Sequence, residues 1–411
     1  MGAIEPQIVP LVLYILSNQN ECGYDYIDNA VQMLSFLTYY LDDISSLLWT
    51  ACGPLLTALD SWASDYITEI AAPLLTYMSK QMDLFLTGTC EDGVSFTNKL
   101  LHTIEQQLAM ETEGYETEAK AGAVLATCLL TCARGRINEA VPKLLHILVL
   151  RLSKPLRTSG LKHALLDAVL ASIYYDAYSA MALLKMDHES GAAIVFRILF
   201  ETLPAMEKNL SQRLIVMAFS SMLALPLAFL PALASSNIEA MFRQIIRELV
   251  LIGEELKERD EDGEDMDDED AAEEDEDADS PNKGKMTSSP FFQSLEVPEG
   301  GYDEDEDCIN AEDETYREAL VSLDKEERVK RQLYIDGEPV DGEDDDEEGF
   351  DYTSPLENAD VLGYFVCTLH AVSAQDPALI ARLQGALDLE DAERLKELVR
   401  GPTSGLQPKA V

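Results

Sequence analysis

The sequence lacks the short motifs on which most enzyme active sites are built. Its 411 residues contain no Gly-rich phosphate-binding loop, no Gly-x-Ser-x-Gly turn and no protein-kinase signature. The five histidines are scattered without metal-ligand spacing, and the acidic runs lack the frame of an EF-hand loop. We therefore expect neither an enzyme nor a bound cofactor or metal.

Two further absences concern compartment and fold. The N-terminus has no basic stretch before an apolar core, so a secretory signal peptide is not expected. The seven cysteines are odd in number and irregularly spaced, which favours buried free thiols in a reducing compartment. No segment alternates apolar and polar residues as a half-buried strand does, so strand content should be close to nil.

Basic residues are scarce. The chain has 30 Lys and Arg against 76 Asp and Glu, a formal net charge of −46. Such a surface repels phosphates and argues against direct nucleic-acid binding. It favours basic protein partners, which it would meet quickly and in a salt-sensitive manner.

The negative charge is concentrated in the second part of the chain. Residues 1–253 carry a net charge of −10, residues 254–411 one of −36, and fifteen of the twenty residues from Asp260 to Asp279 are acidic. Self-repulsion prevents such a run from folding alone and lets it attract cations. We predict that basic partners bind the carboxylates of Asp260, Glu261, Asp262, Glu264, Asp265, Asp267, Asp268, Glu269, Asp270, Glu273, Glu274, Asp275, Glu276 and Asp277.

Apolar segments of helical length follow one another through the first part of the chain. In 161–175, for example, Leu161, Leu165, Val169 and Ile173 recur at every fourth position, as one buried helix face requires. The segments pair with a repeat of about 40–50 residues, the size of HEAT or armadillo units. We predict an all-α fold, an α-solenoid of HEAT-like antiparallel helix pairs with a long disordered acidic insert. Helices are expected over 8–16, 24–41, 45–59, 66–86, 96–110, 116–132, 137–152, 161–175, 193–203, 212–225 and 238–256.

The same patterns predict how the chain is organised. Apolar periodicity returns at Leu356, so the acidic segment is an insert between helical repeats and not a tail. The expected order is helical repeats over 1–256, an acidic disordered loop over 257–309, a charged helix over 310–333, a second acidic linker over 334–355, C-terminal helices over 356–400 and a disordered tail over 401–411.

One uncharged run, Leu214–Ala234, is long enough to span a membrane. It contains Pro226 and Pro231, which end helices and initiate turns. We therefore expect a buried pair of helices there and no membrane insertion.

Residues 134–162 reverse the local charge, with seven basic side chains and one Glu. The plain interpretation is a solvated helix face. The functional interpretation is a docking surface for the chain's own acidic segment or for an acidic partner, formed by Arg134, Arg136, Arg151, Lys154 and Arg157.

Two cysteines near this segment, Cys128 and Cys132, stand at positions i and i+4 of a predicted helix. We expect buried thiols there, with a pair of metal ligands as the alternative.

Several segments, in order along nearly the whole chain, resemble the C-terminal part of an importin-β superfamily karyopherin, of the subgroup with importin seven and importin eight. The similar residues are Gly23-Tyr24-Asp25-Tyr26, Leu37-Thr38 and Ile44-Ser45 before Trp49, Gly135-Arg136-Ile137 before Val141-Pro142, Tyr174-Tyr175, and Tyr352–Asp360 after an acidic insert at the subgroup's position. The N-terminal repeats with which the family binds RanGTP have no counterpart here, so we expect a partial chain without a direct Ran contact of its own.

The resemblance implies nuclear transport. The solenoid would carry basic cargo such as ribosomal proteins or histones, bind Phe-Gly nucleoporins between its outer helices and work with Ran GTPase in the full-length family. It would then be found in cytoplasm and nucleus and at pores of the nuclear envelope. The alternatives are an acidic chaperone, or a HEAT scaffold, that binds basic proteins without transporting them.

Overall fold

The computed structural model describes residues 4–17, 23–41, 43–110, 116–186, 188–269 and 354–400, with side chains at all but 188–190, 258–269 and 399–400. Over these ranges the regular elements are helices, apart from one isolated bridge between Thr89 and Ser95. The predicted all-α class is confirmed.

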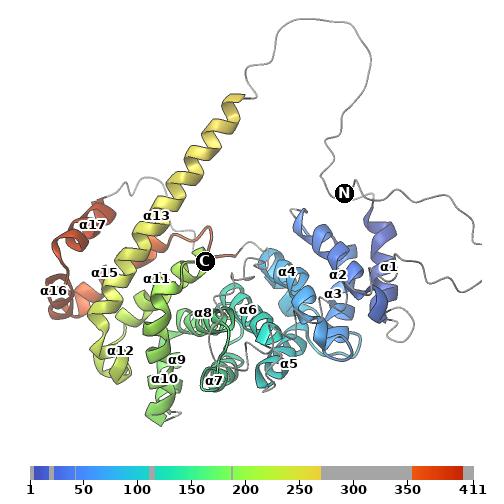
Figure 1. Ribbon diagram of the computed structural model, residues 1–411, viewed down its shortest axis with the longest axis horizontal. Helices are drawn as coiled ribbons and strands as arrows, with labels where there is room; N and C mark the ends of the chain where they lie inside the picture. Colours follow the sequence, from blue (N-terminus) through green and yellow to red (C-terminus); the bar gives the residue numbers. More distant parts are fainter. Residues whose placement is uncertain are drawn as a thin grey trace, which may run out of the picture. The chain divides into compact units, whose positions relative to one another are not determined.

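The helices follow one another closely along the chain, and Figure 1 shows them with the labels used below. They are α1 (Glu5–Ser17), α2 (Tyr24–Tyr39), α3 (Ser46–Leu59), α4 (Ile67–Thr87), α5 (Phe96–Ala109), α6 (Glu116–Cys132), α7 (Val141–Leu152), α8 (Ser159–Tyr175), α9 (Ala177–Met186), α10 (His188–Thr202), α11 (Asn209–Leu223), α12 (Ala232–Ser236), α13 (Ile238–Glu269), α15 (Val361–Gln375), α16 (Pro377–Gly385) and α17 (Leu389–Arg400). Single 3-10 turns lie at Ser64–Tyr66, Leu203–Ala205 and Leu227–Phe229.

Side-chain caps set several helix starts. The hydroxyls of Ser45, Ser95 and Thr158 each accept a hydrogen bond from the backbone N–H three residues later. Each bond satisfies one of the N–H groups that the first turn of a helix leaves without a partner. The carboxylates of Asp360 and Asp376 cap α15 and α16 in the same way.

The helices stack in two layers. In one layer, α2, α4, α6, α8, α11 and α15 pack each against the next, although α11 and α15 are far apart in sequence. In the other, α1, α3, α5 and α7 do the same, and α7 then contacts both α9 and α10. Contact between each helix pair and its neighbours is the packing of an α-solenoid, which confirms the predicted architecture.

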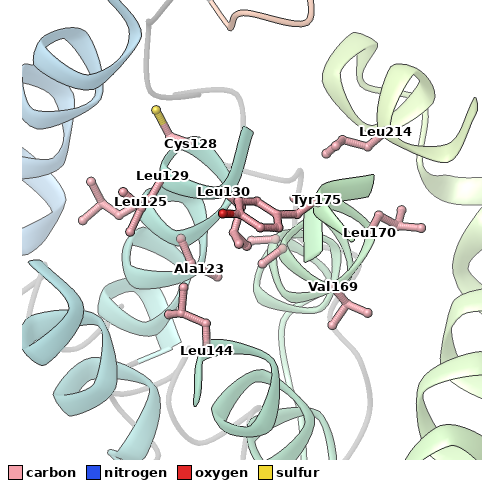
Figure 2. Packing of buried hydrophobic residues seen from close by; sticks show 14 of the residues in the cluster. Ala123, Leu125, Cys128, Leu129, Leu130, Leu144, Val169, Leu170, Tyr175 and Leu214 are labelled. Carbon is pink, nitrogen blue, oxygen red and sulfur yellow. The ribbon is translucent and has the colours of Figure 1, made fainter. Parts of the chain in front are cut away.

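The middle of the stack is deeply buried. Figure 2 shows buried side chains of α6, such as Leu125 and Leu129, and of α8, such as Val169 and Leu170, which all belong to the hydrophobic core. The helix α8 is buried almost all round, since it touches α6, α7, α9, α10 and α11. The i+4 pattern in the sequence indicated one buried face of this helix, and the structure shows that the other faces are covered as well.

A lysine ties two neighbouring helices of the first layer. Lys80 Nζ donates to the carbonyl oxygens of Thr38 (3.0 Å), Tyr39 (2.6 Å) and Leu41. These carbonyls lie at the C-terminal end of α2, where backbone acceptors lack partners within the helix and a positive charge is favourable. The next residue, Gln81, leaves helical geometry (φ −141°, ψ 58°) and interrupts α4 there.

A carboxylate is enclosed between α8 and α11. Asp167 Oδ2 accepts from Ser211 Oγ at 2.9 Å, while Oδ1 is buried without a hydrogen-bond partner. Part of the residue reaches solvent, but Oδ1 does not. Burial raises the pKa of Asp167 to about 7, and the Ser211 hydrogen bond and the charge of Lys208 offset only part of that rise.

The long uncharged run is broken at its prolines, as predicted, but it forms one buried helix and not a buried pair. Residues 214–223 complete α11, and Pro226 and Pro231 precede a 3-10 turn and the short α12. Among the described helices, none combines the length and the apolar character that crossing a bilayer requires.

The largest differences from the sequence-based prediction are at α9 and α13. The helix α9 was not predicted; Asp176 breaks the chain after α8 and accepts hydrogen bonds from the backbone N–H (3.2 Å) and hydroxyl (2.6 Å) of Ser179 at the start of α9. The helix α13 continues to Glu269, so residues 257–269 are helical and not loop. The remaining acidic loop, the charged helix over 310–333, the linker up to 353 and the tail over 401–411 lie outside the described residues.

Replacing Lys80 tests the tie between α2 and α4. Lys80→Met keeps the aliphatic stem but removes the donor, which leaves three carbonyls to water, so we expect a loss of about 1–3 kcal/mol of stability. Urea unfolding followed by circular dichroism measures it. Lys143→Met is the matched control, because its ion pair with Glu105 is exposed and should contribute less than about 0.5 kcal/mol. Equal losses in the two variants would contradict the capping role.

Asp167→Asn tests the enclosed carboxylate. An aspartate in the unfolded chain titrates near 3.9 and Asp167 in the fold near 7, so the folded protein keeps a proton that the unfolded one releases. Wild-type stability therefore falls as the pH rises between these values, relative to the variant. We expect Asp167→Asn to gain on the wild type from pH 5 to pH 8, on the order of 1 kcal/mol or more. A stability difference independent of pH would contradict this assignment.

Candidate functional site

The acidic segment leaves and re-enters the solenoid between α13 and α15. The described residues up to Gly263 and those from 354 onward belong to one compact unit. The rings of Phe242 in α13 and Phe365 in α15 lie 6.0 Å apart, and Arg382 of α16 donates to Glu239 of α13 at 2.7 Å. Helices on the two sides of the segment therefore pack directly on each other, as expected of an insert between repeats.

Helix α11 contacts the chain on both sides of the insertion point, the place between α13 and α15 where the acidic segment is inserted. Asn209 Nδ2 donates to both carboxylate oxygens of Glu255 in α13, at 2.5 and 2.6 Å. The fully buried guanidinium of Arg213 donates to the carbonyl of Leu356 at 3.2 Å, just before α15. These bonds therefore tie α11 to the chain on both sides of the acidic segment.

The structure places only part of the predicted cargo-binding set. Asp260, Glu261, Asp262, Glu264, Asp265, Asp267, Asp268 and Glu269 follow one another along the last turns of α13. A helix rises only about 1.5 Å per residue, so these carboxylates are densely spaced along the axis. Asp270, Glu273, Glu274, Asp275, Glu276 and Asp277 lie outside the described residues.

Ser354, which starts a Ser-Pro dipeptide in acidic surroundings, is buried at 3% exposure. Its hydroxyl accepts a hydrogen bond from Leu356 N at 3.3 Å, and its own N–H donates to Glu357 at 3.0 Å. It therefore belongs to the folded insertion point and is not an accessible hydroxyl.

The basic residues of segment 134–162 have different environments. The guanidinium of Arg134 lies 4.0 Å from the centre of the Tyr174 ring, a cation–π contact. Arg136 is paired with Asp83 and also donates to the carbonyl of Cys132 at 3.0 Å. These side chains hold the turn between α6 and α7 against its neighbours.

Arg151 and Arg157 meet at one carboxylate. Arg151 is buried, 3.7 Å from Glu116, and the backbone N–H of Arg157 donates to Glu116 at 3.0 Å. Burial raises the pKa of Glu116, but the hydrogen bonds from Arg157 and Thr158 and the charge of Arg151 outweigh it and bring that pKa below its usual value. Arg151 thus stabilises the α7–α8 turn, while Lys154 of the same turn lines an open hollow.

Two hollows lie along the seam between α7 and the α9–α10 pair. One, of about 290 Å³, is lined by apolar residues of α7 and α9, with His146 at its side. The other, of about 410 Å³, is lined by Lys154 and Lys162 and by residues of α10 that include Arg197. Sequence reasoning missed Arg197 and Met186, which line these hollows, because neither lies within the basic segment or in a motif.

The two neighbouring thiols are Cys128, which is buried, and Cys132, which is partly exposed. Their sulfur atoms are 3.7 Å apart, and burial raises the pKa of Cys128 well above its ordinary value. Across the described part of the chain, no three His, Cys, Asp or Glu side chains gather as a metal site would require.

Curated proteins similar to this chain come from plants, amoebae and animals. The importin beta-like SAD2 homolog of Arabidopsis thaliana is 24% identical over 266 residues, which cover 62% of this chain and 25% of that protein. A probable importin-7 homolog of Dictyostelium discoideum is 23% identical over 270 residues, 64% of this chain and 24% of that protein. Importin-8 of Homo sapiens is 23% identical over 133 residues, 32% of this chain and 12% of that protein.

The chain thus spans about a quarter of the length of the first two relatives. No family model and no solved structure matches it. The resemblance found in the sequence is confirmed, and the curated proteins to which this chain is similar are members of the importin-β family.

Proposed function

We propose that this chain is part of a nuclear transport receptor that binds basic cargo proteins and carries them through the nuclear pore. The observation that carries the proposal is the similarity to importins over more than half of the chain, together with a solenoid of stacked helix pairs. The chain would then act in cytoplasm and nucleus and at nuclear pores. As the resemblance implies, release of the cargo would use Ran GTPase.

In this proposal the carboxylates of residues 260–277 bind the cargo. The bond network of Asn209 and Arg213 anchors the insertion point, and α13 carries the first of these carboxylates beyond it. Many weak contacts between a carboxylate-rich segment and a Lys- and Arg-rich protein add up by multivalency. They are screened by salt, which suits capture followed by release.

The outer helices would provide contacts for Phe-Gly nucleoporins. The apolar hollow of about 290 Å³ between α7 and α9 is large enough for one aromatic side chain, and Leu183 and Met186 form part of its wall. This contact separates transport from the rival function, because an acidic chaperone or a HEAT scaffold needs no affinity for pore proteins.

The basic segment has a narrower role than its charge suggests. Arg136 and Arg151 are paired with carboxylates of the solenoid, so we assign them to stability first. Docking of an acidic partner through Arg134, Lys154 and Arg157 stays a prediction, which increasing salt would weaken.

Neutralising the carboxylates at the end of α13 tests cargo binding. We expect Asn or Gln at the eight acidic positions from 260 to 269 to weaken binding of a purified linker histone about tenfold at low salt, and to reduce the salt dependence. Fluorescence anisotropy measures both. The matched control neutralises eight other carboxylates, Asp303, Glu304, Asp305, Glu306, Asp307, Glu312, Asp313 and Glu314. If the control loses as much affinity, only the net charge matters and the assigned segment is wrong.

A substitution in the apolar hollow tests pore binding. Met186 is 79% exposed, so Met186→Glu should leave the fold intact while it places a charge where an aromatic ring would bind. We expect Phe-Gly peptides to bind about five- to tenfold more weakly, as measured by surface plasmon resonance. Leu389→Glu, at another exposed position, should have no effect. Unchanged binding in the Met186 variant would remove this hollow from the proposal.

A further inference from the structure

The two hollows beside α7 form successive parts of one seam. The lining residues of α7 recur at helical spacing, from Pro142 through His146 and Val149 to Leu152. Those of α10 do the same, from Gly191 through Ile194 and Ile198 to Thr202. Because residues three and four apart share a helix face, one face of each helix lines both hollows.

The ends of this seam differ in chemistry. Around the first hollow, Leu145, Val149, Leu183 and Leu184 offer apolar surface, and Met186 stands exposed at its rim. A concave apolar wall of this size fits one large side chain.

The second hollow combines an apolar wall with positive charge. Ile194 and Ile198 contribute the wall, and Lys154, Lys162 and Arg197 contribute three cations against the carboxylate of Glu201. In the part of the chain that the structure describes, no ion pair neutralises Lys162 or Arg197, whereas Lys143, Arg136 and Arg151 each meet a carboxylate.

We propose that this seam binds an acidic peptide segment of a partner protein that carries one large apolar side chain. The apolar residue enters the hollow beside Met186, and carboxylates that follow it lie against Lys162 and Arg197. The occupant follows from charge complementarity. With a net charge of −46, most of the chain repels an acidic peptide, so a local group of cations confines the peptide to this place.

The proposal does not rest on a role in nuclear transport. A Phe-Gly peptide has no charge that the second hollow could recognise, so its binding can be distinguished from that of an acidic peptide. Arginine and lysine contacts to carboxylates strengthen where solvent access is reduced. An acidic peptide with an aromatic anchor should therefore bind more tightly than an uncharged peptide with the same anchor.

The test uses the full chain and a fluorescein-labelled peptide in which one Phe precedes a run of Glu. Two further peptides replace either the Phe by Ala or the Glu run by Gln, and a Phe-Gly peptide serves as comparator. Fluorescence anisotropy at low salt gives the affinities. We expect each peptide replacement to weaken binding about tenfold, and the double variant Lys162→Gln/Arg197→Gln to reduce binding of the Glu peptide by the same factor.

The control is Arg243→Gln/Arg247→Gln, which removes two exposed charges of α13 outside the seam and should change affinity less than about twofold. Circular dichroism confirms that both double variants are folded. Equal losses in the two double variants would mean that net charge alone acts, and absence of Glu-peptide binding would overturn the proposal directly. Binding of the Phe-Gly and Glu peptides with equal affinity would also overturn it, while leaving the pore contact standing.

Discussion

The packing of each helix against the next in the layer from α2 to α15 is the interaction on which the other features depend. A single helix pair cannot bury its apolar surface alone, and α6 and α8 are covered only because α4 and α11 lie on their far sides. The stack therefore behaves as a chain of nearest-neighbour contacts. Polar ties such as Lys80 at the end of α2 and Asp167 beside Ser211 fix the relation of particular neighbours within it.

The same packing explains how the chain carries a long acidic insert. Because α15 rests on α11 and α13, the last helices join the stack without using the residues between them. Arg213 and Asn209 hold the two ends of the insertion point in place. A strongly charged segment is thus attached to a folded array whose stability comes from apolar contacts elsewhere. In the proposed function, this separation lets the carboxylates contact cargo without disturbing the solenoid.

Sequence patterns predicted most of the helices because these rest on local signals, as does the predicted insert. Apolar residues at every third or fourth position indicated α8, and the carboxylate run indicated the insert. The helix α9 was missed although its N-cap, Asp176, is a local signal. Partners far apart in sequence could not be predicted: Arg136 meets Asp83, and Arg151 meets Glu116. The cationic hollow was missed for the same reason, since Arg197 reaches it from α10 while Lys154 and Lys162 come from the turn and the start of α8.

If this chain belongs to the machinery that crosses the nuclear pore, it should pass through the pore itself, and that passage can be measured directly. The labelled chain, added to permeabilised cells without other transport factors, should accumulate in nuclei faster than an inert protein of equal size, because contacts with Phe-Gly repeats admit it to the pore. Exclusion from the nucleus at the rate of the inert protein would contradict the account. In that case, an acidic solenoid that binds basic proteins outside transport would be the better description.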